Sequence, residues 1–176
     1  TVEGDYIGGV APGAKLYALK ANPDGFGGFW NDAIIAAWDW CITHQNDDPD
    51  NPIMVISNSL GSGHTNDPKE AERLRPGMAL ATENANAVGI TVLAASGNDG
   101  FTDGISSLAA LPRIISVGAV FDTTDQVTWY SNTGTILDIH APADPMYTTD
   151  IIGDGGYTSG DYMPYFNGTS SACPFA

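Results

Sequence analysis

Five short, mainly apolar segments recur along the chain, and they constrain its fold more than any other feature. Each is a nearly continuous apolar run rather than an alternation of apolar and polar residues. Continuous runs of this length are typical of strands that are buried on both faces, as they are in parallel sheets. The five predicted strands cover residues 15–21, 53–59, 90–96, 114–120 and 136–141.

Helical patterns lie between these predicted strands. Residues 29–45 form one pattern, and residues 67–89 form a second one that begins with Asp67 as a candidate cap. Pro76 interrupts the second pattern, which predicts a kink or a break into two helices. Strands that alternate with helices indicate an α/β fold with right-handed crossovers. We therefore expect a three-layer α/β/α domain with a mainly parallel central sheet.

Length and charge narrow the class of protein. The chain has 176 residues, of which 43% are hydrophobic, and it contains neither an internal repeat nor a long linker, so residues 1–176 are predicted to form a single domain. Its net charge of −15 argues against nucleic acid and against anionic membrane surfaces as partners. No apolar run has the length of a membrane span. The excess of acidic over basic residues is compatible with a secreted protein. We interpret it as a solvated acidic surface rather than as a specific calcium site.

The chain contains two cysteines, Cys41 and Cys173. Neither has the spacing of a zinc ligand, and no CxxC motif occurs. Two free buried thiols are the favoured state, and a disulfide remains the alternative.

Two polar residues could carry chemistry, one where a helix could begin and one just after a predicted strand. Ser170, in the run N-G-T-S-S-A-C-P at 167–174, could be a nucleophile at a helix N-terminus, or only a helix cap. Asn98, in A-S-G-N-D-G at 95–100, could donate to an oxyanion, or only form a turn. Taken separately, the cap and the turn are favoured.

Taken together, the segments resemble the catalytic domain of the subtilisin-like serine peptidases, the subtilase family. The resemblance covers nearly the whole chain, and its most specific parts are the G-T-S segment followed by A-C-P and the A-S-G-N-D-G loop. The matching segments, in order, are residues 8–21, 55–63, 89–100, 114–120, 130–143 and 167–174.

The resemblance implies roles for particular residues. Ser170 matches the nucleophile, and Asn98 matches the oxyanion donor, together with the backbone N–H of Ser170. Three segments match the parts that hold an extended peptide by main-chain hydrogen bonds: one wall of the specificity pocket, the opposite wall, and a covering edge. In that order they are Ser59-Leu60-Gly61, Ala95-Ser96-Gly97 and Gly25-Phe26-Gly27.

The resemblance also implies the setting in which such a protein works. We expect protein or peptide substrates, a monomeric state, an extracellular location and no required cofactor. A structural calcium ion is possible, with unknown ligands, and no other metal site is expected.

Two members of the family's catalytic triad do not match any residue of the chain. The triad runs Asp, His, Ser along the sequence, and the His is expected in an H-G-T motif before G-G-V-A-P. No H-G-T occurs, and none of His44, His64 and His140 has the context of the general base. We therefore expect a catalytic domain that is truncated at both ends, with little or no peptidase activity of its own.

Two other classes of protein remain as alternatives. The first is a non-catalytic relative that binds peptides or has a structural role. The presence of both Ser170 and Asn98 argues against it. The second is an unrelated α/β hydrolase or binding domain, and the absence of a G-x-S-x-G elbow argues against an esterase of that class.

Overall fold

A four-stranded parallel sheet forms the centre of the protein. The computed structural model describes residues 9–22 and 28–176. The strands are adjacent in the order in which they occur along the chain, and each neighbouring pair is parallel, as the apolar runs predict. They are β1 (Val55–Asn58), β2 (Thr91–Ala95), β3 (Ile114–Phe121) and β4 (Ile139–Asp144).

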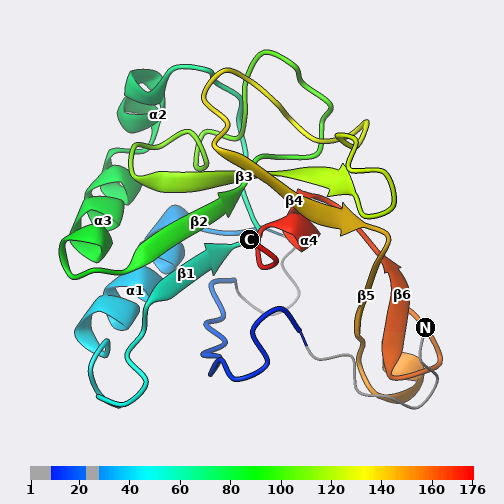
Figure 1. Ribbon diagram of the computed structural model, residues 1–176. Coiled ribbons are helices and arrows are strands. Elements are labelled where there is room, and N and C mark those ends of the chain that lie inside the picture. Colours follow the sequence, from blue (N-terminus) through cyan, green and yellow to red (C-terminus); the bar gives the residue numbers. More distant parts are fainter. Residues whose placement is uncertain (1–8, 23–27) are drawn as a thin grey trace.

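Helices cover both faces of this sheet (Figure 1). On one face, α1 (Asn31–Thr43) packs beside α3 (Pro76–Ala87), and their buried residues share a core with Val92 and Ala94. On the other face, α4 (Thr169–Ala172) packs against the sheet, and a second core joins Leu93 and Ala95 to residues of α4. Because successive side chains of a strand point to opposite faces, β2 contributes to both cores. The three-layer α/β/α arrangement is confirmed.

The second predicted helix is two helices, as Pro76 suggests. Asp67 caps α2 (Pro68–Leu74), because its side-chain oxygen accepts a hydrogen bond of 2.9 Å from the backbone N–H of Lys69. Arg75 is the C-cap of α2, and Pro76 begins α3. Proline has no N–H to continue the first helix but is well suited to the first turn of the next one.

The predicted strand at residues 15–21 is wrong. This segment has no regular structure, and Leu16 is 92% exposed. A strand needs a neighbouring strand to satisfy its backbone groups, and within the described residues β1 pairs only with β2. Apolar composition alone therefore does not make this segment a strand.

The predicted strand at residues 136–141 begins three residues later than expected, as β4. Just before β4 starts, a side chain rather than the backbone connects this segment to β3. The Asp138 carboxylate accepts hydrogen bonds from both the N–H and the hydroxyl of Ser116, at 2.8 and 2.7 Å.

An antiparallel hairpin, β5 (Met146–Thr149) with β6 (Tyr162–Phe166), was not predicted. It lies to one side of the main sheet and leads the chain into α4 (Figure 1).

The two cysteines are free and buried, which confirms the favoured state. Cys41 belongs to the core on the α1 side and Cys173 to the core on the α4 side, so the sheet separates them. Burial raises the pKa of both thiols, which keeps them protonated near neutral pH. Within the described part of the chain, no helix has the length and apolar character needed to cross a bilayer.

Candidate active site

Ser170 lies in the first turn of α4, and its hydroxyl faces a neighbouring segment. Gly168 precedes the helix with a φ of 97°, a left-handed conformation that glycine adopts without strain. Because Gly168 occupies the cap position and no side chain caps the helix, the interpretation of Ser170 as a helix cap is wrong. Its Oγ instead donates to the backbone oxygen of Ser59 at 3.2 Å, and the Ser59 hydroxyl donates to the backbone oxygen of Ser170 at 2.7 Å.

The side chain of Asn98 is fixed beside this serine by long-range contacts. Its Oδ1 accepts from the backbone N–H and the hydroxyl of Thr169, at 2.8 and 2.9 Å, and the Thr169 hydroxyl also accepts from the N–H of Gly97 at 3.2 Å. The side chain of Asn98 therefore does not only form a local turn, because it also connects its loop to the start of α4. Since its oxygen is occupied by Thr169, the Nδ2–H donors are the part of the amide that can serve a reacting group next to Ser170.

A groove of about 510 Å³ runs up to Ser170. Most of the residues predicted to bind substrate line it, together with five that were not predicted. The predicted residues on its wall are Ser59, Leu60, Gly61, Ala95, Gly97, Asn98 and Ser170, and the additional ones are Phe29, Ser62, Gly63, Asp99 and Ser106. Ser96 lies behind the wall, fully buried, and the predicted edge Gly25-Phe26-Gly27 lies outside the described residues.

Arg75 holds one wall of the groove in place by hydrogen bonds. Its guanidinium donates to the backbone oxygen and the hydroxyl of Ser62, at 3.1 and 2.6 Å, and to the hydroxyl of Ser107 at 2.7 Å. Partial burial lowers the pKa of this guanidinium. The same Ser107 hydroxyl donates to the Ser62 oxygen at 2.7 Å, so the wall is held by a connected set of hydrogen bonds.

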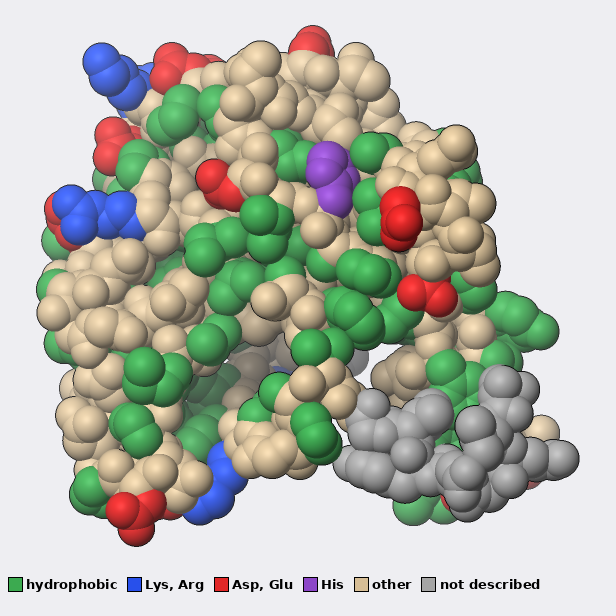
Figure 2. All heavy atoms as spheres, viewed as in Figure 1, with side chains coloured by type: hydrophobic (Ala, Val, Ile, Leu, Met, Phe, Trp, Pro, Cys, Tyr) green, Lys and Arg blue, Asp and Glu red, His purple; other side chains and the backbone are tan. Residues whose placement is uncertain are grey.

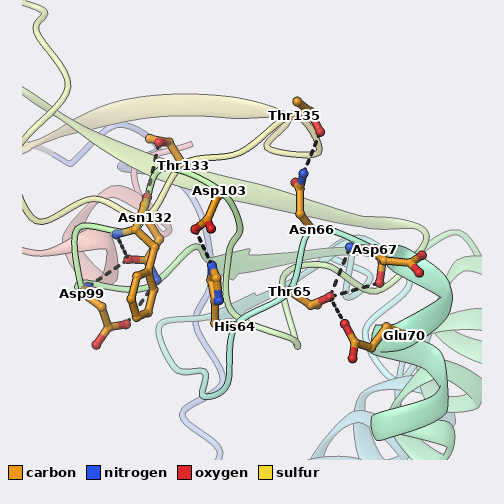
Figure 3. A network of polar contacts seen from close by, with 11 residues as sticks. His64, Thr65, Asn66, Asp67, Glu70, Asp99, Asp103, Asn132, Thr133 and Thr135 are labelled. Atoms are coloured by element: carbon orange, nitrogen blue, oxygen red, sulfur yellow. Dashed lines mark hydrogen bonds and ion pairs between the residues drawn. The ribbon is translucent and has the colours of Figure 1, made fainter.

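Asn132 holds the loop that carries Asn98. Its side chain is fully buried, and its Oδ1 accepts from the backbone N–H groups of Asp99 and Phe101 at 2.9 and 3.1 Å. Its Nδ2 donates to the Asp99 carboxylate at 3.2 Å, and Figure 3 shows the side chain directed into this loop. This role of Asn132 was not predicted from the sequence. The sequence nevertheless contained a signal for it, since Asn132 lies in one of the segments that resemble the family.

The Asn132 contact predicts a large effect for a small substitution nearby. Gly97 has a φ of 107°, and a Cβ at this position would overlap Nδ2 of Asn132. Gly89→Ala is the matched control, because Gly89 has a φ of 86° but nothing within 4 Å of its Cβ position. We expect Gly89→Ala to lower the free energy of unfolding by about 1–2 kcal/mol through backbone strain. Gly97→Ala should cost roughly 1–3 kcal/mol more through the overlap. Urea unfolding of both variants measures the difference, and equal losses would contradict it.

None of the three histidines is placed as a partner of Ser170 in the described structure. His44 Nδ1 contacts the backbone oxygen of Trp40 at 2.9 Å, and His64 Nε2 contacts the Asp103 carboxylate at 3.0 Å (Figure 3). His140 lies exposed on β4. Residues 9–22 and 28–176 also contain no group of three His, Cys, Asp or Glu residues that could hold a metal ion.

Few charged side chains lie near the middle of the face drawn in Figure 2, where hydrophobic side chains gather and the surface below them is hollowed. The fold and the site together define a three-layer α/β protein with a groove that ends at a serine beside a fixed asparagine amide. The sequence profile described as the subtilase family matches residues 1–176, and the chain belongs to that family.

Individual relatives agree with this family. The chain is 33% identical to subtilisin DY of Bacillus licheniformis over 172 residues, covering 94% of the chain and 52% of the relative. It is 34% identical to subtilisin E of Bacillus subtilis (strain 168) over 169 residues, covering 94% of the chain and 38% of the relative. The chain thus spans about half or less of the length of these relatives.

Solved structures support the fold. Sphericase superposes with a TM-score of 0.64 at 26% identity, over 85% of this chain and 47% of that one. A lanthipeptide protease superposes with a TM-score of 0.75 at 21% identity, over 94% of this chain and 54% of that one.

Proposed function

We propose that this chain supplies the nucleophile, the oxyanion donors and the substrate groove of a serine endopeptidase. The observation that carries the proposal is the pair of hydrogen bonds from Thr169 to Asn98 Oδ1, which fixes an amide donor one residue from Ser170 at the end of a groove. The family of the chain supports the same function.

The chemistry follows from these positions. Ser170 Oγ attacks the carbonyl carbon of a peptide bond and loses its proton to a base. The negative charge that develops on the carbonyl oxygen is stabilised by Asn98 Nδ2–H and the backbone N–H of Ser170. The C–N bond then breaks, the amine leaves with a proton, and water hydrolyses the acyl-enzyme. The described residues do not supply this base.

Substrate recognition should depend mainly on the backbone of the bound peptide. The groove wall from Ser59 to Gly63 is rich in serine and glycine, so it offers backbone groups rather than large side chains. An extended peptide can add to such a wall as a strand. We further propose that the protein works outside the cell as a monomer, acts on proteins or peptides and needs no cofactor, with a calcium ion, if present, in a structural role.

A non-catalytic, peptide-binding relative is the second candidate function. The observation that favours it is that no histidine is hydrogen-bonded to Ser170 within the described residues. In that case the groove would bind a peptide and Ser170 would contribute only its hydrogen bond to Ser59.

A fluorophosphonate probe distinguishes the two functions. It should be applied to residues 1–176 and to the longest natural reading frame that contains them, together with an assay of casein hydrolysis. We expect Ser170 to be labelled and casein to be cleaved in the longer protein, with little or no hydrolysis by residues 1–176. Binding of peptides without labelling or cleavage in either protein would establish the second candidate.

A further inference from the structure

Tyr130 connects the two segments that carry the candidate catalytic groups. It lies between β3 and β4 and is buried. Its backbone oxygen accepts from the N–H of Gly100 at 2.8 Å, in the loop that carries Asn98. Its side-chain hydroxyl accepts from the N–H of Gly168 at 3.1 Å, two residues before Ser170. One residue therefore contacts both the loop of the amide donor and the turn of the nucleophile.

The hydroxyl of Tyr130 donates a hydrogen bond as well as accepting one. A phenol has one proton to donate, and the Asp144 carboxylate at the end of β4 accepts it at 3.3 Å. Because this proton is directed to Asp144, the oxygen presents a lone pair to the N–H of Gly168. Burial raises the pKa of Tyr130, so the hydroxyl stays protonated near neutral pH.

Packing of the ring alone does not explain a tyrosine at position 130. The ring belongs to the core on the α4 side, with Leu93, Val117 and Ala172, and a phenylalanine ring could occupy the same space. The hydroxyl adds an acceptor for the buried N–H of Gly168, at the left-handed turn that starts α4. A buried N–H without an acceptor is costly, so loss of the hydroxyl should shift or loosen this turn.

We propose that Tyr130, oriented by Asp144, is a positioning residue that sets the backbone N–H of Ser170 relative to the side-chain amide of Asn98. The inference rests on the proposed function, which assigns these two groups to the oxyanion. Both donors must lie about 3 Å from the same oxygen atom, so a small displacement of the turn weakens the stabilisation of the transition state.

Tyr130→Phe tests this role in the longest natural protein that contains the chain. Loss of the hydroxyl should lower kcat for casein hydrolysis about 10- to 100-fold with little change in KM, because the two donors act on charge that develops in the transition state. Asp144→Asn should keep most of the activity, since its side-chain oxygen can still accept from Tyr130. Asp144→Ala removes that acceptor and should lower kcat.

Ser116→Ala is the matched control. The Ser116 hydroxyl also accepts from a backbone N–H and donates to a carboxylate, both of Asp138, at 2.9 and 2.7 Å. It is buried on β3 and does not line the groove. This variant should lower the urea midpoint, as Tyr130→Phe does, but retain kcat. A purely structural role for Tyr130 would instead give both variants the same kcat.

Hydrogen exchange of residues 167–173, followed by mass spectrometry, separates this inference from the proposed function. Exchange there should be faster in Tyr130→Phe than in the unmodified protein, and unchanged in Ser116→Ala. If the unmodified protein neither cleaves casein nor reacts with the fluorophosphonate probe, the proposed function fails, and faster exchange in Tyr130→Phe would leave the positioning role standing. Unchanged exchange in Tyr130→Phe, an unchanged kcat in an active protein, or equal losses in Asp144→Asn and Asp144→Ala would overturn the inference.

Discussion

Replacing Ser170 by alanine is expected to abolish peptide hydrolysis by the longest natural protein that contains this chain. The substitution removes the Oγ that is proposed to form the acyl bond, and no other group at the site is proposed to take its place. The expected loss in kcat is about 10⁶-fold, a magnitude measured in subtilisin, a member of the same family. Stability should change little, because the one hydrogen bond that is lost, to the backbone oxygen of Ser59, contributes about 1 kcal/mol.

Ser171→Ala is the matched control for this prediction. Ser171 is the adjacent serine of α4, and it is buried away from the groove. This variant should retain activity and labelling by the fluorophosphonate probe, while Ser170→Ala loses both. Steady-state kinetics of both variants test this prediction. If Ser170→Ala kept more than a few per cent of the activity, Ser170 would not be the nucleophile.

Substitution of Asn98 should lower kcat with little change in KM. The Nδ2–H donors are proposed to stabilise charge that develops only in the transition state, so their removal affects turnover more than binding. The expected loss is about 10²–10³-fold in kcat, again the size measured for the corresponding donor in subtilisin.

Two Asn98 variants separate this electrostatic role from a structural one. Asn98→Asp keeps an oxygen that can accept from the N–H and hydroxyl of Thr169, but it loses the donors. Asn98→Ala loses both, and it leaves the buried Thr169 with two unpaired groups, which should lower the free energy of unfolding by about 1–3 kcal/mol. We therefore expect both variants to be deficient in kcat, and only the alanine variant to be clearly less stable. Near-normal turnover in the stable aspartate variant would exclude the oxyanion role.

The elements that depend on local sequence were predictable. The strands at 53–59, 90–96 and 114–120 are apolar enough to be buried on both faces, and they became β1, β2 and β3. The division of the helical segment at Pro76 follows from the missing N–H of proline. Ser170 and Asn98 were identified through the resemblance of their segments to the family, because each residue taken alone was better explained as a cap or a turn.

Other features depend on contacts between segments far apart in the chain. Residues 15–21 have the composition of a strand, but in the described structure no strand pairs with them. Asn98 is 71 residues from Thr169 and Asn132 is 33 from Asp99, so neither pair has a local signal. The buried hydroxyl of Ser106 has no hydrogen-bond partner among the described residues, and this depends on all the segments around it rather than on its neighbours in the chain. The sequence by itself thus determined the layers of the fold, and the family to which the candidate site residues were matched, because burial and helix breaks are local in origin. Only the tertiary structure decided which polar groups meet, because hydrogen bonds need atoms within about 3 Å, wherever those atoms lie along the chain.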